Sequence, residues 1–543
     1  MDATTRFDTN VVGAMPVIVN YFDRLQLGDV INELVPWEGD VELGALAEIL
    51  VLNRLLRPKA MFKIGEWAEK ASVTDYFGLT SEQLNDDRLG RALERIAAYG
   101  DTVGAALVMN AISEFDLKVN QIHYDVTSVE LFGAYETDED KQPPTPKPAY
   151  GRTKSGRKNV KQIQQGLSVS GDGGVPVCQL PLDGNAAESK THIANLKKLD
   201  QTLPKQSLLY IADTKLDTPE NLLNIAAGKG KFVCGGAFQP HLKEKYLKLR
   251  SKLDKINYCS KSQLQRPKEK RDGYQGVETE ETIFGKVDGH EVRLKYRLIF
   301  IWSERKARDE AKTRERHIEK IREEFEKVLR NLNKFSLKTE DKIVRRLEKA
   351  RAKYTEGSLF TYQLTRGKDK KFHLTYELDS AALSRLKKLE GVFVLKTNLP
   401  KHRYPIKKTL ELYRDQTCVE RRFRDLKGRL AVNPMFLKKP ERMAGLLYIL
   451  VWALMVMALM ERSVRNELEG EPMYGIYPEN RPSPAPTGKA MFECFETLSI
   501  VIIKNKGEIT RRLGELSDVQ RKIVKLLGIP PNALRTYKRR CGL

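Results

Sequence analysis

Three acidic residues, far apart in the chain, have the types and settings that metal-dependent phosphoryl transfer requires. Asp125 lies in IHYDVTSVELFG, where apolar and polar residues alternate, so a strand would place it on the same face as His123. Asp213 ends the apolar stretch LLYIAD, and Glu420 lies in YRDQTCVERRFRDLKG, which has helical spacing. Carboxylates can hold two divalent ions beside a scissile phosphate, where one ion activates the attacking oxygen and the other stabilises the leaving oxygen. This chemistry requires the three side chains to converge.

Each of these residues also has a purely structural interpretation. Asp125 could be a solvent-facing strand residue, although aspartate is disfavoured in strands. Asp213 could cap the helix that follows it. Glu420, taken alone, is best explained as part of a solvated helix face, and His123 is expected to be structural. The joint arrangement of the three carboxylates favours the functional interpretation.

The stretches around these residues resemble the DDE transposases of bacterial insertion sequences. IHYDVTSVELFG resembles the first-aspartate block with Asp125 in the catalytic place, and LLYIADTKLDTPENL resembles the second with Asp213 in that place. YRDQTCVERRFRDLKG resembles the glutamate block, with Glu420 as its glutamate. GRTKSGRKNVKQ (151–162) and LDGNAAESKT (182–191) also resemble segments that this group has between the two aspartates.

The glutamate block of that family carries tyrosine, arginine, glutamate and lysine at fixed spacing. Tyr413, Glu420 and Lys427 match the pattern, whereas Gln416 stands where arginine is expected. Arg414 is the alternative source of the arginine contact, although its spacing differs. The resemblance implies that Tyr413 and Lys427 contact DNA phosphates and that Gln416 or Arg414 takes the arginine's role there.

The resemblance covers about residues 117–470 and implies a ribonuclease-H-like fold. It implies that Asp125, Asp213 and Glu420 hold two Mg²⁺ ions, with Mn²⁺ as a substitute. The expected reaction is cleavage of DNA at the ends of an insertion sequence, followed by attack of the freed 3′-OH on target DNA. The expected partners are double-stranded DNA, as terminal inverted repeats and as target, and further copies of the chain in a dimer or larger oligomer. The alternatives are a metal-dependent nuclease on the same fold, without strand transfer, and a non-catalytic DNA-binding factor.

The elements that must position these residues are predicted in the order β-β-β-α-β-α-β. The first strand lies in 117–133, and 162–170 and 175–182 form a hairpin through the turn GDGG. A helix at about 188–202, a strand at 207–214, a helix at 218–227 and a strand at 231–236 follow. Thr218 and Pro219 are a suitable N-cap and first residue for the second helix. The order predicts an α/β fold with a mixed five-stranded sheet and flanking helices.

The remaining chain is predicted to divide as follows. Residues 1–112 are predicted to form a helical N-terminal domain, which is a candidate for DNA binding. Asp86 or Asp87 is expected to cap one of its helices. The catalytic core is predicted to occupy 113–236 and 391–470. A β-rich insertion, with a hairpin turn expected at Asp288-Gly289 and a charged helical hairpin, separates the two core parts. A helix at about 405–430, which carries Tyr413 and Glu420, is expected after the insertion. The last two segments are a proline-rich linker and a helical, basic C-terminal tail. The predicted bounds are 134–160 for a mobile loop within the core, 237–390 for the insertion, 471–489 for the linker and 490–543 for the tail.

Composition favours a polyanionic partner. The net charge is +22 and the isoelectric point is near 9.5. Lys and Arg of 241–272, 342–353 and 401–408 are expected to contact phosphates. Six cysteines without a CxxC pair argue against a zinc ribbon or a disulfide framework. The uncharged stretch 443–460 is long enough to cross a membrane but is predicted to be a buried helix. With no signal peptide expected either, the predicted location is the cytoplasm of a bacterial cell, associated with the nucleoid.

Overall fold

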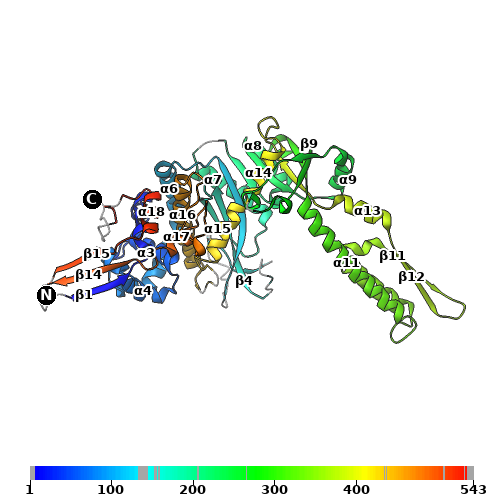
Figure 1. Ribbon diagram of the computed structural model, residues 1–543, viewed down its shortest axis with the longest axis horizontal. Coiled ribbons are helices and arrows are strands. Elements are labelled where there is room, and N and C mark those ends of the chain that lie inside the picture. The colour runs from blue at the N-terminus through cyan, green and yellow to red at the C-terminus, as the bar shows by residue number, and fades with distance from the viewer. Residues whose placement is uncertain are drawn as a thin grey trace. The chain divides into compact units, whose positions relative to one another are not determined.

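The structure is a computed structural model, and it describes residues 6–132, 145–151, 156, 159–204, 207–264, 266–432, 435, 437–505, 508–530 and 532–534. The chain forms two compact units (Figure 1). Unit 1 comprises residues 1–232 and 414–543, and unit 2 comprises 233–413. Most of the loop predicted at 134–160 and the basic end of the predicted tail, RTYKRRCGL, lie outside the described residues.

The sheet of unit 1 is mixed and surrounds one central strand. β2 (Gln121–Glu130) pairs antiparallel with β4 (Lys161–Ser170) and parallel with β6 (Leu209–Ala212). β4 also pairs antiparallel with β5 (Pro176–Leu182) and with the short β3 (Ala149–Tyr150). β7 (Lys231–Gly236) begins in unit 1, where the Lys231 N–H donates to the Leu208 carbonyl over 3.0 Å, and continues in unit 2. The predicted strands are therefore confirmed.

Local turn and cap signals placed the neighbouring elements correctly. The turn GDGG joins β4 to β5, and both Gly173 and Gly174 have positive φ, at 81° and 65°. The Thr218 side chain accepts from the Asn221 N–H at the start of α8 (Pro219–Ala227), as an N-cap should. α7 (Thr191–Thr202) lies between β5 and β6 in the sequence.

The apolar stretch 443–460 lies within α16 (Pro440–Glu467), which is the central helix of unit 1. α16 packs against α6 (Asp86–Phe115), α3 (Leu43–Leu56) and β5. A Cβ added at Gly445 would lie 2.0 Å from the Leu93 carbonyl oxygen, so glycine allows α16 and α6 to pack closely. Among the described residues α16 alone is long and apolar enough to span a membrane, and its apolar window is wholly buried. The predicted core helix is thus confirmed.

The N-terminal helices form part of unit 1 because they surround α16 and reach β5. Asn85, and neither Asp86 nor Asp87, caps α6, since its side chain accepts from the Arg88 N–H over 2.9 Å. Four more helices complete this region: α1 (Met15–Leu25), α2 (Leu27–Leu34), α4 (Ile64–Lys70) and α5 (Val73–Phe77).

The prediction of a helical C-terminal tail was only partly correct, because the tail also contains two strands. β14 (Ser499–Asn505) pairs antiparallel with both β15 (Glu508–Leu513) and β1 (Arg6–Val11). The alternation in SIVIIKN suits a strand, but its first partner lies at the other end of the chain. The tail does contain helices, α17 (Gly488–Glu493) and α18 (Asp518–Leu526).

Unit 2 is larger than the predicted insertion, because 391–413 belongs to it as well. Its sheet has the order β7, β13 (Val392–Thr397), β10 (His290–Ser303), β9 (Tyr274–Val287), β8 (Asp254–Ile256). β9 and β10 form the predicted hairpin through Asp288 and Gly289, which both have positive φ. α9 (Pro240–Leu249) and α14 (Ile406–Arg414) pack on this sheet, and the short α10 (Lys261–Leu264) lies between β8 and β9 in the sequence.

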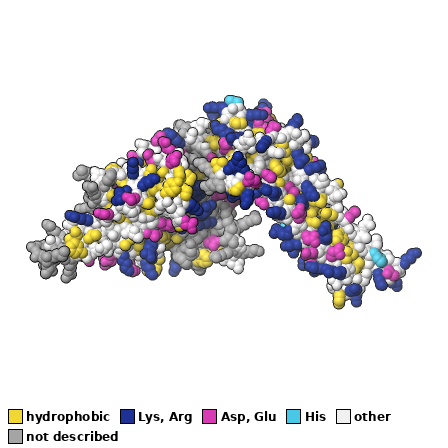
Figure 2. All heavy atoms as spheres, in the orientation of Figure 1, with side chains coloured by type: hydrophobic (Ala, Val, Ile, Leu, Met, Phe, Trp, Pro, Cys, Tyr) yellow, Lys and Arg dark blue, Asp and Glu magenta, His cyan; other side chains and the backbone are white. Residues whose placement is uncertain are grey.

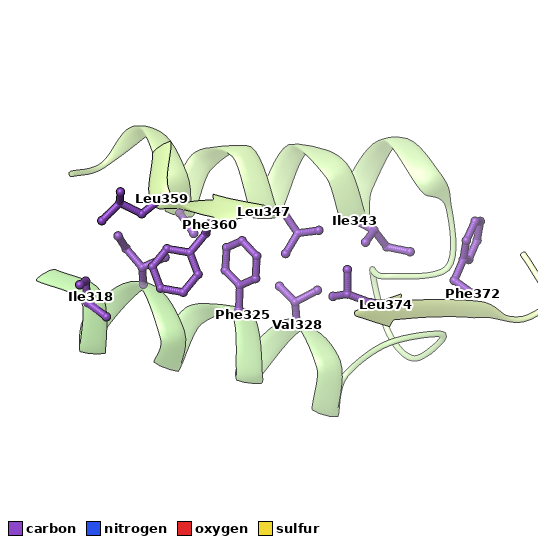
Figure 3. Close-up of a cluster of buried hydrophobic side chains, with 11 residues drawn as sticks. Ile318, Phe325, Val328, Ile343, Leu347, Leu359, Phe360, Phe372 and Leu374 are labelled. Atoms are coloured by element: carbon purple, nitrogen blue, oxygen red, sulfur yellow. The ribbon is translucent and has the colours of Figure 1, made fainter. Parts of the chain in front are cut away.

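The charged helix of the insertion forms an intramolecular hairpin, as predicted. α11 (Glu304–Arg330) packs against α12 (Glu340–Ala352), and Ile318, Phe325 and Val328 point into a buried cluster (Figure 3). Phe360 and Leu374 enter the cluster from the hairpin of β11 (Phe360–Arg366) and β12 (Phe372–Leu378). α13 (Ser380–Leu389) also packs here.

Candidate active site

Asp125 and Asp213 occupy matching places on neighbouring parallel strands. β2 and β6 pair with Tyr124 opposite Ala212, so one further residue along both chains brings Asp125 opposite Asp213. Adjacent strands lie roughly 4.8 Å apart. Asp125 lies within β2, whereas Asp213 directly follows the last residue of β6. The two predicted aspartates are therefore brought together.

Both aspartates make local hydrogen bonds. The Asp213 carboxylate accepts from the Lys215 N–H over 2.8 Å and caps a short 3₁₀ helix, Thr214–Leu216. The Asp125 Oδ1 accepts from the Val126 N–H over 2.8 Å. Both side chains are half-buried. The capping interpretation of Asp213 is thus correct, and it is compatible with a site there because a carboxylate has a second oxygen.

Glu420 lies on a helix that crosses the same sheet. α15 (Thr417–Lys427) packs against β2 and β4, and Glu420 is exposed in its first turn. The Gln416 side chain just before the helix donates from Nε2 to the Tyr124 carbonyl over 2.8 Å. Glu420 follows Gln416 by four residues, so it lies one turn further on the same side of the chain. Gln416 also contacts His123, whose side chain shares the Asp125 face of β2, so this face is the one that α15 covers.

A chain of hydrogen bonds fixes this contact between α15 and β2. The Gln121 Nε2 lies 2.9 Å from the His123 Nε2 and can only donate to it, so Nδ1 of the ring carries the proton. That Nδ1–H donates to the Gln416 Oε1 over 3.1 Å, and Gln416 donates onward to Tyr124. Burial lowers the pKa of His123 to about 4, so the ring is neutral at pH 7. The expected structural role of His123 agrees with these contacts.

Gln416 therefore lies between a helix and a strand and is nearly buried, at 9% exposure. The donor and acceptor of its amide are both engaged inside the protein. This placement differs from the DNA-contacting position predicted for it. An arginine there would bring a charge into the contact with a neutral imidazole and a backbone carbonyl, which explains why glutamine suits this chain.

The opposite face of β2 carries a second buried polar network. The Tyr124 hydroxyl donates to the Thr191 Oγ1 over 2.9 Å, which ties β2 to the start of α7. The Asn195 Nδ2 donates to the hydroxyl of Tyr210, on β6, over 3.0 Å. A Cβ at Gly166 would lie 2.5 Å from the Tyr124 hydroxyl, so glycine makes room for that ring. These contacts fix β2 and β6, the strands of Asp125 and Asp213, on the face of the sheet opposite to the two carboxylates.

Arg422 is a buried arginine that the sequence patterns did not indicate. It is 1% exposed and donates to the carbonyls of Gly173 and Gly174, each over 2.8 Å. It also donates to the Glu461 carboxylate of α16 over 2.9 Å. Burial alone would raise the pKa of Glu461, but Arg422 and Arg465 hold it below its ordinary value. Arg422 thus anchors α15 to the β4–β5 turn and to α16.

The other predicted DNA-contacting residues are not gathered on one helix. The helix is interrupted between α14 and α15. Tyr413 and Glu420 therefore lie on different helices, and not on one helix as predicted. Tyr413 is in unit 2 and packs beside a buried cluster that includes Ile256 and Leu410. Arg414 is the last residue of α14 and is half-buried. Lys427 is the last residue of α15, seven positions after Glu420 and half-buried.

The three carboxylates suit a divalent cation by chemistry, since Mg²⁺ prefers oxygen ligands. They also share one face of the sheet, by the register of β2 with β6 and the packing of α15. Within the described ranges, however, no three or more His, Cys, Asp or Glu side chains stand close enough to form a metal-binding group. The structure therefore supports the donor set and its common face but gives no coordination geometry.

In the comparison with known protein families, one region of the chain matches a family. Residues 7–109 match a family described as a domain of unknown function, DUF4277. This match covers most of the predicted N-terminal domain. No curated protein matches the chain.

Proposed function

We propose that this protein is a DDE-type transposase, which binds the ends of an insertion sequence, cleaves the DNA there and joins the 3′-OH to target DNA. The observation that carries the proposal is the common face of the three acidic residues. Asp125 and Asp213 are matched across β2 and β6, and Glu420 lies on the helix that packs on β2.

The strand order supports a ribonuclease-H-like core. Within unit 1 the neighbours run β5, β4, β2, β6, with β7 beginning beside Leu208. The first three are antiparallel hairpin strands, and β6 joins in parallel after the α7 crossover. An acidic residue on the central strand and another at the end of its parallel neighbour suit the active site of this fold.

In this proposal Asp125, Asp213 and Glu420 hold two Mg²⁺ ions, with Mn²⁺ as a substitute. The ions would supply activation of the attacking oxygen and stabilisation of the leaving oxygen. The chain's own part is positioning: Gln416 and Arg422 fix α15, and the polar network of Tyr124 fixes the strand of Asp125. Lys427, two turns beyond Glu420, would meet a phosphate of the bound DNA.

DNA as the partner is supported by the charge of +22. Lys and Arg are interspersed with Asp and Glu over the visible face (Figure 2), so DNA contact would occur at local basic sites. Burial of α16 suits a soluble protein that meets DNA in the cytoplasm. Joining two ends would require at least a dimer of this chain on DNA.

The test uses DNA that carries the inverted repeats flanking the gene, incubated with Mg²⁺ and the full chain. Asp125→Asn, Asp213→Asn and Glu420→Gln should each abolish both cleavage and joining, because each removes a charged ligand without changing size. Asp200→Asn, which changes an exposed carboxylate of α7, is the matched control and should remain active.

The outcomes separate the alternatives. Full activity in one of the three variants would remove that residue from the site. Cleavage without joining would favour a nuclease, and DNA binding without either step in the wild type would favour a non-catalytic DNA-binding factor.

A further inference from the structure

A cavity of about 790 Å³ in unit 1 is lined by an excess of basic side chains. It lies between the loop after α3, the helix α4, the start of α1 and the chain that follows α15. We call it the basic hollow and define it by its five cations, Arg57, Lys59, Lys63, Lys70 and Arg429. Its acidic lining residues are Glu66 and Glu496.

One of the two acids is already neutralised. The Lys70 ammonium lies 2.5 Å from the Glu66 carboxylate and lowers the pKa of that group. With Lys70 and Glu66 taken as a pair, Arg57, Lys59, Lys63 and Arg429 outnumber Glu496, the other acidic lining residue. Because like charges repel, a hollow of this composition favours an anionic occupant.

The loop that carries Arg57 and Lys59 is fixed by hydrogen bonds to the buried side chain of Asn53. Asn53 is fully buried, and its Nδ2 donates to the Arg57 carbonyl over 3.1 Å while its Oδ1 accepts from the Lys59 N–H over 3.1 Å. Both ends of this amide are thus used to fix the loop. Because the loop backbone is fixed, ordering Arg57 and Lys59 on an anion costs less than it would on a mobile loop.

Arg429 links the hollow to the chain that follows α15. Its Nε and Nη2 donate to the Leu55 carbonyl, over 3.1 Å and 2.9 Å, and its guanidinium lies 5.1 Å from the centroid of Phe492. Arg429 follows Lys427 by two residues. The basic hollow therefore borders the end of the helix that carries Glu420, although most of its lining comes from the N-terminal region.

We infer that the basic hollow binds phosphodiester groups of DNA, as a contact separate from the acidic face of the sheet. This inference rests on the proposed function only in taking DNA as the polyanion. A DNA end is favoured over free phosphate because Phe62, next to Lys63, is 69% exposed and offers a ring on which the terminal base of a short duplex can stack.

The test measures affinity for a short duplex of random sequence as a function of salt, in EDTA so that no cleavage occurs. The triple variant Arg57→Gln, Lys59→Gln, Lys63→Gln should flatten the slope of log affinity against log salt by roughly 0.9 for each phosphate that the variant no longer neutralises. The control triple Lys197→Gln, Lys229→Gln, Lys522→Gln removes the same charge from exposed sites of unit 1 and should leave the slope near that of the wild type. The pair Lys59→Arg, Lys63→Arg keeps the charge and should also preserve it.

An unchanged slope in the first triple, or an equal fall in the control triple, would overturn the inference. Inorganic phosphate is the second probe, compared with chloride at equal ionic strength. If phosphate raises the melting temperature of the wild type but not of the first triple, while both bind DNA with the same salt slope, the occupant is free phosphate and the DNA assignment fails. Loss of cleavage in the acidic variants does not enter this measurement, so failure of the hollow and failure of the proposed catalysis are distinguishable.

Discussion

Replacing Arg422 with methionine should destabilise unit 1 by about 3 kcal/mol. The side chain makes hydrogen bonds to the carbonyls of Gly173 and Gly174, to Glu461 and, over 3.2 Å, to Asp425. Removing one member of a buried ion pair typically costs about 3–5 kcal/mol, because the other charge is left buried and unpaired. The lower end applies here, since Glu461 keeps Arg465 at 3.1 Å and the Gly488 N–H at 2.7 Å.

The measurement can be confined to unit 1. Of the four tryptophans in the sequence, Trp37, Trp67 and Trp452 belong to unit 1 and Trp302 to unit 2. In a Trp302→Phe background, fluorescence during urea unfolding reports unit 1 alone. Arg422→Met should lower the urea midpoint of that transition with little change in its slope.

A double variant makes the reasoning refutable. Arg422→Met with Glu461→Gln removes both charges, while the glutamine oxygen can still accept from Gly488. Its loss of stability should be at least about 1 kcal/mol smaller than the sum of the losses in Arg422→Met and Glu461→Gln measured singly, because the contact between the two side chains can be lost only once. A loss below about 1 kcal/mol in Arg422→Met, or losses that simply add in the double variant, would show that Arg422 is not an anchor of α15.

Three further predictions concern other parts of the fold. Burial lowers the pKa of His123 to about 4, against an ordinary value of 6.5. The neutral imidazole therefore contributes about 3 kcal/mol to the stability of the fold above pH 6.5, and this contribution is lost as the pH falls from 6.5 towards 4. His123→Gln should flatten the dependence of the unfolding free energy on pH in that window. Phe325→Ala should cost unit 2 about 3–5 kcal/mol in thermal or urea unfolding, whereas Phe335→Ala, at a ring that is 80% exposed, should cost little, and equal losses would contradict the assignment of Phe325 to the core. Gly173→Ala should cost about 1–2 kcal/mol or more, since its φ is 81° and a Cβ would lie 3.0 Å from the Arg462 side chain; an unchanged melting temperature would show that the turn adapts.

Sequence patterns predicted the elements whose causes are local. The turn GDGG, the Thr218 cap and the pair Asp288-Gly289 each fix their own backbone, so the residues alone identified them. The register that places Asp125 opposite Asp213 is less local, yet it follows from one strand with internal polar residues and another that ends in aspartate. These features were enough to predict a mixed sheet with flanking helices.

Features that depend on distant partners could not be predicted in this way. β14 pairs with β1 from the other end of the chain, and the residues of either strand do not indicate which strand is its partner. Arg422 lies in the run ERRFRD, where a solvated arginine is the normal expectation. Its burial depends on two turn carbonyls and on Glu461, all remote in sequence. Tyr413 was misplaced for a different reason, since the charged sequence around Asp415 gave no sign that the helix breaks there.

The contacts of α15 explain how a long insertion can precede the helix that carries Glu420. The chain leaves unit 1 after residue 232 and returns at residue 414. From there Gln416 binds the strand of Asp125 at one end of α15, and Arg422 binds the β4–β5 turn and α16 two turns later. All of these partners belong to unit 1, so the place of Glu420 on the sheet is set by residues of unit 1 alone. The insertion can therefore vary in length and fold without moving the three carboxylates, provided that Gln416 and Arg422 keep their partners.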